Sequence, residues 1–225
     1  MGSQSMGYSR RDLVSAAVVA GASLSVASCV SAPRKLALPE PLPPLPPAPV
    51  PAQLGPPATL LDQAKLALDS HPGVFVHRDR IALADFALPS SEPRFHIVDL
   101  ASGRIERSFL VAHGSGSDPA RTGMLHQFSN QPGSNATSRG AYLTAGAYVG
   151  KHGRSQRLIG LDPDNSMALE RAIVVHGAAY VDPRLAASEG RIGRSQGCFA
   201  LEQDKVGEVM VTLGEGRMIY AGKVA

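Results

Sequence analysis

Hydrophobic side chains recur with two different spacings along the chain. Near residue 60 they follow helical intervals, at Leu60, Leu61, Ala64 and Leu68. Thr59 stands where a helix N-cap belongs, and Pro72-Gly73 is a typical helix stop signal. The pattern predicts one short helix over residues 59–68, at the start of a folded domain.

After this helix the apolar residues come in short runs interrupted by Gly, Pro, Ser and Asn. Such runs are typical of β-strands bounded by turns. The predicted strands cover residues 81–86, 94–100, 105–112, 142–148, 157–161, 172–176 and 217–222. A polar turn at 99–103 predicts a β-hairpin, and the spacing over 202–210 predicts a second helix. We therefore expect a mainly β fold with a few short helices.

The N-terminal segment has the features of an export signal. Arg10 and Arg11 precede an apolar stretch at 13–27, which is shorter than the roughly 20 residues that span a bilayer. Residues 1–29 are therefore predicted to direct export. The paired arginines resemble a twin-arginine signal, but ordinary secretory signals also carry them, so the route stays open. Residues 26–29 resemble a bacterial lipobox in which Cys29 receives the lipid.

Proline dominates the next segment, residues 30–58. Such a sequence favours the extended polyproline II conformation and predicts a linker. Residues 59–225 then form one predicted folded domain. We expect an exported periplasmic lipoprotein that is held at the membrane through Cys29; the alternative is cleavage of the signal after Ala32, which would leave Cys29 without a role.

Length and charge limit the class of protein further. A chain of 225 residues has room for one domain of ordinary size with appendages. The formal net charge is only +3, without the dense Lys/Arg clusters that bind phosphate backbones. We therefore expect no nucleic-acid partner, and the sequence does not indicate an oligomeric state.

The chain contains two cysteines, Cys29 and Cys198. If Cys29 is lipidated or removed, Cys198 is the remaining thiol and no disulfide can form within the chain. An unpaired cysteine in an exported protein indicates either pairing with another chain or a thiol that is kept for chemistry.

Two segments carry residues suited to cysteine catalysis. His176 ends the apolar run 172–176, so a stiff strand would orient its ring. Cys198 follows Gly197, and the small glycine lets the N–H groups of Gly197 and Cys198 converge on a substrate oxygen as an oxyanion hole. A thiol needs a base, and His176 is the best-placed one. Arg194 adds positive charge, so we expect a thiol pKa below the value of about 8.5 for free cysteine.

Each of these residues also has a purely structural interpretation. Cys198 could be a small buried apolar residue, His176 a hydrogen-bonded core histidine, and Arg194 a solvated loop charge. Three other histidines, His113, His126 and His152, lack the spacing of a compact metal-ligand set. We therefore expect no metal and no cofactor.

The catalytic motif resembles that of a known family. His176-Gly177 followed by Ser195-Gln196-Gly197-Cys198 resembles the signature of L,D-transpeptidase (YkuD-type) catalytic domains, and residues 193–195 resemble the murein L,D-transpeptidase branch. The resemblance continues upstream over 111–114, 128–130, 132–134, 138–140 and 148–153. It thus covers most of the predicted domain.

This resemblance implies a β-sandwich fold and a cysteine acyltransferase that acts on peptidoglycan stem peptides. It makes Cys198 the nucleophile and His176 the general base, held by a backbone carbonyl, with Ser195 supporting the turn. The candidate substrate-binding residues are Arg194, Ser195, Gly177 and His113. Two positions depart from the common pattern: Gln196 stands where histidine is frequent, and Ala200 where arginine or asparagine often occurs.

Three functions follow from these residues. The first is a transpeptidase, the second a carboxypeptidase or peptidase that hydrolyses the same acyl-enzyme, and the third an inactive wall-binding module. The intact set of His176, Gly197 and Cys198 argues against the third. The choice between the first two depends on whether an amine or water reaches the thioester, which the sequence leaves open.

Overall fold

The computed structural model describes residues 59–224. The predicted export signal, the lipidation site Cys29 and the proline-rich linker lie outside the described residues. None of the helices within 59–224 is long and apolar enough to cross a membrane.

The predicted first helix is confirmed as α1 (Leu60–Ser70). Thr59 caps it, since its hydroxyl accepts a hydrogen bond from the backbone N–H of Asp62 at 3.1 Å. The buried face of α1 presents Leu60, Ala64 and Leu68 to the outer face of the sheet. Burial of such side chains is the main force that holds a short helix in place.

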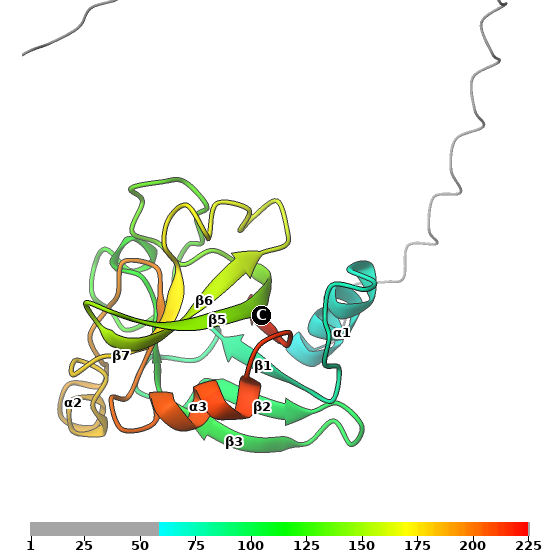
Figure 1. Ribbon diagram of the computed structural model, residues 1–225. Coiled ribbons are helices and arrows are strands. Elements are labelled where there is room, and N and C mark those ends of the chain that lie inside the picture. The colour runs from blue at the N-terminus through cyan, green and yellow to red at the C-terminus, as the bar shows by residue number, and fades with distance from the viewer. Residues whose placement is uncertain (1–58, 225) are drawn as a thin grey trace, which may run out of the picture. The chain divides into compact units, whose positions relative to one another are not determined.

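Nine strands form one sheet in the order β3-β2-β1-β9-β5-β6-β7-β8-β4 (Figure 1). In chain order they are β1 (Arg80–Asp85), β2 (Phe95–Asp99), β3 (Ile105–Phe109), β4 (Val111–Ala112), β5 (Gly140–Gly150), β6 (Gly153–Gly160), β7 (Val174–Gly177), β8 (Phe199–Leu201) and β9 (Met218–Gly222). The remaining helices are α2 (Pro183–Glu189), α3 (Val206–Leu213) and the 3₁₀ turn η1 (Ser115–Ser117). The fold is thus mainly β with short helices, as predicted.

The hairpin predicted around residues 99–103 is confirmed between β2 and β3. Asp99 organises the turn, because its carboxylate accepts the backbone N–H of Ser102 at 2.8 Å and its carbonyl accepts that of Gly103 at 2.9 Å. Gly103 has a φ of 68°, a conformation that glycine adopts without a steric cost.

The segment predicted as one strand, 105–112, is two strands in the structure. It breaks at Leu110, so that β3 pairs with β2 while β4 pairs with β8 at the other end of the strand order. Residues 105–112 therefore contribute one strand to each edge of the sheet. The sheet must curve so that its two edges meet at this segment. Ala82 and Ile97 from β1 and β2 share a core cluster with Leu158 and Val175 from β6 and β7. This two-walled core agrees with the predicted sandwich.

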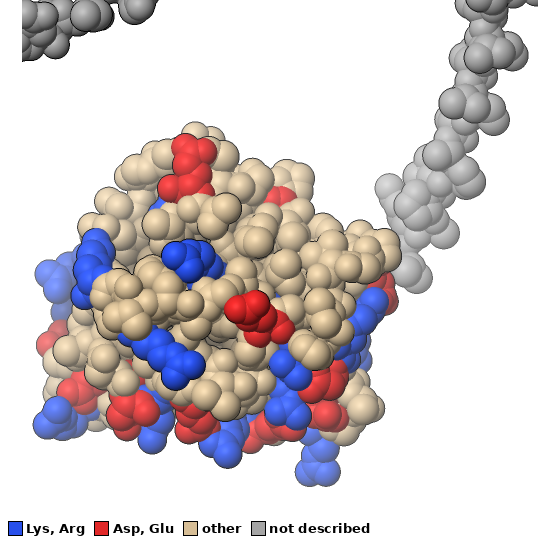
Figure 2. Space-filling view, in the orientation of Figure 1, with Lys and Arg blue, Asp and Glu red and all other residues tan. Residues whose placement is uncertain are grey.

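Three elements were not predicted: η1, α2 and β8. The second predicted helix, 202–210, begins later and ends later, as α3, but it buries the expected residues Val206, Val209 and Met210. On the surface, ion pairs such as Arg80–Glu106 and Arg107–Glu208 connect neighbouring elements. In Figure 2, Lys/Arg and Asp/Glu side chains are mixed along the side where β2 and β3 lie, so this face has no field of a single sign.

Candidate active site

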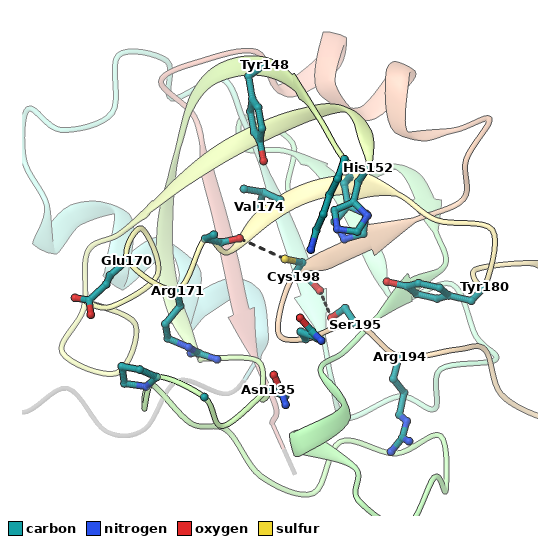
Figure 3. A pocket seen from close by; sticks show the side chains of 16 residues that line it. Asn135, Tyr148, His152, Glu170, Arg171, Val174, Tyr180, Arg194, Ser195 and Cys198 are labelled. Carbon is teal, nitrogen blue, oxygen red and sulfur yellow. Dashed lines mark hydrogen bonds between the residues drawn. The ribbon is translucent and has the colours of Figure 1, made fainter.

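The two predicted catalytic residues lie on and next to adjacent parallel strands. β7 carries His176, and Cys198 immediately precedes β8. His176 is paired with Ala200, and Val175 with Phe199. Because side chains alternate between the two faces of a strand, Cys198 lies on the same face as Ala200 and His176. Both residues line one cavity of 610 Å³ (Figure 3).

His176 is held by the backbone in one tautomer. Its Nδ1 lies 3.0 Å from the carbonyl oxygen of Gly177. A carbonyl can only accept, so Nδ1 carries the proton and Nε2 is free to receive one. The side chain is 2% exposed, and burial lowers the pKa of His176 below its usual value. The imidazole is therefore neutral near pH 7, as a base must be.

A second histidine covers the first. His152, at the turn between β5 and β6, stacks on His176 with ring centroids 4.3 Å apart and planes inclined by 22°. His152 and the neighbouring Lys151 both lower the pKa of His176, since a positive charge beside it disfavours the imidazolium. The sequence argued against a metal-binding role for His152 and indicated only that it lines the site or lies on the surface. Within residues 59–224 no group of three or more His, Cys, Asp or Glu side chains is arranged to hold a metal ion.

The Cys198 thiol is not activated in the way that the sequence suggested. Burial raises the pKa of Cys198 above its usual value, and the backbone N–H of Val174 and the guanidinium of Arg171 offset this only in part. The sulfur lies 3.5 Å from the carbonyl oxygen of Ala172, to which the thiol donates (Figure 3). The expected low pKa is therefore wrong for this resting arrangement, in which a neutral thiol accompanies a neutral imidazole.

Ser195 stabilises the turn that leads to Cys198 through two side-chain hydrogen bonds. Its hydroxyl donates to the carbonyl of Cys198 at 2.7 Å and accepts the N–H of Gly197 at 3.1 Å. This geometry matches the supporting role expected for Ser195. It also gives the Gly197 N–H a partner within the turn, so this donor must leave Ser195 before it can serve an oxyanion. The oxyanion hole formed by Gly197 and Cys198 thus stays a prediction.

Arg194 does not supply the charge expected beside the thiol. Its guanidinium donates to the backbone carbonyls of Ser115 and Asp118. Figure 3 shows it at the edge of the cavity, pointing away from Cys198. Arg171 is the guanidinium that acts on the pKa of Cys198 instead. The sequence offered no motif at Arg171; the only signal was its place directly before the segment that carries His176.

Two residues proposed to bind substrate are not in the cavity lining. His113 is 1% exposed; Arg94 donates to its Nδ1 at 2.6 Å, and its Nε2 lies 3.5 Å from Asp118. Burial and the charge of Arg94 lower the pKa of His113 to about 4. Gly177 is also buried, next to Gln203, and contributes its carbonyl to His176. His113 and Gly177 thus support the site from behind, which corrects their expected role.

Among the charged residues of the cavity wall, cations outnumber anions. Lys151, Arg171 and Arg194 line it together with one carboxylate, Glu170. Tyr148 and Tyr180 supply the aromatic lining, and Figure 3 places them on two sides of Cys198. A peptide with several carboxylates complements such a wall.

Comparison with known proteins places this site in a family. The model of the L,D-transpeptidase catalytic domain matches residues 59–221. An L,D-transpeptidase from Mycobacterium smegmatis is similar in structure, with 15% identity, 64% of this chain and 58% of that chain covered, and a TM-score of 0.39. An L,D-transpeptidase from Xylanimonas cellulosilytica has 14% identity, with 71% of this chain and 69% of that chain covered, and a TM-score of 0.39.

This chain therefore spans less than two thirds of the length of the Mycobacterium smegmatis protein. Comparison with curated proteins finds no match. The family match covers most of the chain and includes both His176 and Cys198. The protein belongs to the L,D-transpeptidase catalytic domain family.

Proposed function

We propose that the protein is a cysteine-dependent acyltransferase that acts on peptidoglycan stem peptides through a thioester. One observation carries this proposal: Cys198, directly before β8, and His176, on the adjacent β7, line one cavity, and the Gly177 carbonyl leaves Nε2 of His176 free to accept the thiol proton. Family membership supports the same chemistry.

In the first half-reaction the thiol of Cys198 turns from the Ala172 carbonyl toward His176. Nε2 of His176 takes the proton while the sulfur attacks the carbonyl carbon between an L-centred and a D-centred residue. The bond from carbon to nitrogen then breaks, and His176 returns the proton to the leaving amine. The stem peptide remains attached to Cys198 as a thioester.

In the second half-reaction an amine from a neighbouring stem attacks the thioester. His176 accepts the proton of the amine and passes it to the departing thiolate, which restores the resting enzyme. If water attacks instead, the product is a trimmed stem and the enzyme is a carboxypeptidase. Both outcomes use the same two residues.

The resting charges favour proton transfer during the attack over a preformed ion pair. Burial raises the pKa of Cys198 and lowers that of His176, so thiolate and imidazolium are both disfavoured before substrate binds. During the attack, the carbonyl oxygen of the substrate takes up the negative charge that develops as the sulfur loses its proton. The cost of burying a charged thiolate is therefore relieved only in the transition state. The thiol is thereby kept in its less reactive form between turnovers.

The cavity suits an anionic peptide. Its volume of 610 Å³ lies within the usual range for ligand sites, about 300–1,000 Å³. Lys151 can pair with a carboxylate of the stem, and Glu170 can pair with the positive amine of an incoming stem. These pairings are electrostatic and should weaken as salt rises.

Product analysis tests this function. The purified protein is incubated with disaccharide tetrapeptides, and the muropeptides are separated and identified by mass. Dimers with a new L,D bond are expected from the wild type and none from Cys198→Ala. Trimmed monomers alone would assign the hydrolase, whereas equal products from wild type and Cys198→Ala, or no product from either, would refute the proposal.

A further inference from the structure

Arg171 lies beside the cysteine turn, although no catalytic motif includes it. It follows Glu170 in the loop before β7 and lines the cavity together with Cys198. Figure 3 shows its side chain reaching from this loop toward Asn135. The proposed mechanism gives it no direct step.

The guanidinium of Arg171 ties down the loop formed by residues 129–138. Nη1 donates to the carbonyl of Ser129 at 2.9 Å and to the hydroxyl of Ser138 at 2.6 Å. Nη2 donates to the carbonyl of Ala136 and, at 3.4 Å, to the hydroxyl of Ser134. A planar guanidinium can serve four acceptors in fixed directions, which a lysine ammonium cannot reproduce. Arg171 is thus the common partner of both ends of the 129–138 loop.

The guanidinium of Arg171 also packs against Gly197. A Cβ atom on Gly197 would lie 3.1 Å from Nη2 of Arg171 and 2.7 Å from the carbonyl oxygen of Ala136. Arg171 and the loop that it holds therefore set how far the turn before Cys198 can move. All four partners of the guanidinium are neutral oxygens, so these bonds leave its positive charge uncancelled.

Other ionisable groups also line the cavity around Cys198. Lys151 and His152 lie on the β5–β6 turn, Glu170 directly before Arg171, His176 on β7, Tyr180 after β7, and Arg194 before the cysteine turn. Lys151 is exposed, and its ammonium group is at the end of a flexible side chain. Arg171 is half-buried, and its guanidinium is fixed by hydrogen bonds. A fixed, partly desolvated charge acts more strongly on a neighbouring anion than a solvated one does.

We propose that Arg171 is the positioning residue of Cys198: it fixes the 129–138 loop against the Gly197–Cys198 turn and places a permanent positive charge beside the thiolate. This inference rests on the proposed function for its effect on turnover. Its effect on the thiol itself does not depend on which substrate the protein uses.

The test compares Arg171→Gln, which removes the charge, with Arg171→Lys, which keeps it. Arg139→Gln is the matched control, because Arg139 is an exposed arginine of the neighbouring segment that pairs with Asp164. In the full-length protein, the rate of Cys198 alkylation by iodoacetamide is measured against pH. The midpoint should rise by about one pH unit in Arg171→Gln and stay near the wild-type value in Arg171→Lys and Arg139→Gln.

Hydrogen exchange separates the two parts of the role. The backbone N–H groups of 129–138 should lose protection in both Arg171 variants and keep it in Arg139→Gln. An unchanged midpoint in Arg171→Gln, or equal midpoints in Arg171→Gln and Arg171→Lys, would overturn the electrostatic role.

If Arg171→Gln does not fold, Arg171→Lys alone tests the proposal. Loss of hydrogen-exchange protection in the 129–138 loop, with the alkylation midpoint of the wild type, supports the proposal. Unchanged protection of this loop refutes it. Alkylation needs no peptidoglycan, so failure of the proposed function would leave these results readable.

Discussion

Gly197→Ala is the substitution that most sharply tests the packing around the cysteine turn. Gly197 has a φ of 115°, which side chains with a Cβ rarely adopt. The added methyl group would also come within 2.7 Å of the Ala136 carbonyl oxygen and 2.8 Å of Cδ1 of Ile173. Both contacts are shorter than van der Waals distances, so either the turn or the residues packed against it, Ala136 and Ile173, must move.

The expected loss of stability combines two effects. A residue held in a sparsely populated backbone conformation costs about 1–3 kcal/mol. Forcing a methyl group into a filled site costs a further ~1–3 kcal/mol. We therefore expect Gly197→Ala to lower the free energy of unfolding by about 2–6 kcal/mol. Displacement of Cys198 should also reduce acyl transfer by about 100-fold, because a shift near 1 Å can have that effect.

Gly190→Ala provides the control for the backbone effect. Gly190 ends α2 with a φ of 67°, and a Cβ there meets no atom within 4 Å. This variant should cost only about 1–2 kcal/mol and retain activity. Urea unfolding of both variants gives the difference. The packing argument is refuted if Gly197→Ala is no less stable than Gly190→Ala, or if it retains full activity.

Four further predictions concern the site and the N-terminal segment. His176 is a base only when neutral, so kcat/KM should fall as the pH drops through its lowered pKa, with a midpoint below the usual value of about 6.5; a midpoint above 6.5 would contradict the burial argument. His113, with a pKa lowered to about 4, binds a proton more readily in the unfolded chain. The free energy of unfolding should therefore decline as the pH falls from about 6.5 to 4, by up to ~3 kcal/mol, and an NMR titration of His113 near 6.5 would exclude this. A chain beginning at Thr59 should fold cooperatively, and Cys29→Ala should leave the membrane fraction of the host; retention in that fraction would indicate another tether.

Local sequence signals predicted the elements whose boundaries and buried face are encoded within one short segment. Helix α1 has its cap at Thr59 and its apolar face within one short segment, and the β2–β3 hairpin has its turn chemistry at Asp99 and Gly103. β4 and β8 have two and three residues, and their pairing joins Val111 to Leu201. Contacts at that separation in sequence leave no local periodicity, so neither β8 nor the break that separates β4 from β3 was predictable.

The candidate site shows the same division. A motif identified Cys198 and His176, and the structure brings them to one cavity. Closeness in sequence placed Arg194 beside the thiol, but its side chain turns toward Ser115 and Asp118. Arg171 is 27 positions before Cys198 in the chain and reaches the turn only because β7 and β8 are neighbours. The expected low pKa failed because the sequence does not reveal burial.

The most direct test of the proposed chemistry is the intact mass of the protein during turnover. The wild type is mixed with a tetrapeptide stem and quenched in acid within seconds, and peptide mapping then locates any added mass. A stem lacking its terminal D-residue, bound to Cys198, is the predicted adduct, and it should accumulate more slowly in His176→Ala by about 10²–10⁴-fold. An adduct on another residue, or product formed by Cys198→Ala, would contradict the account.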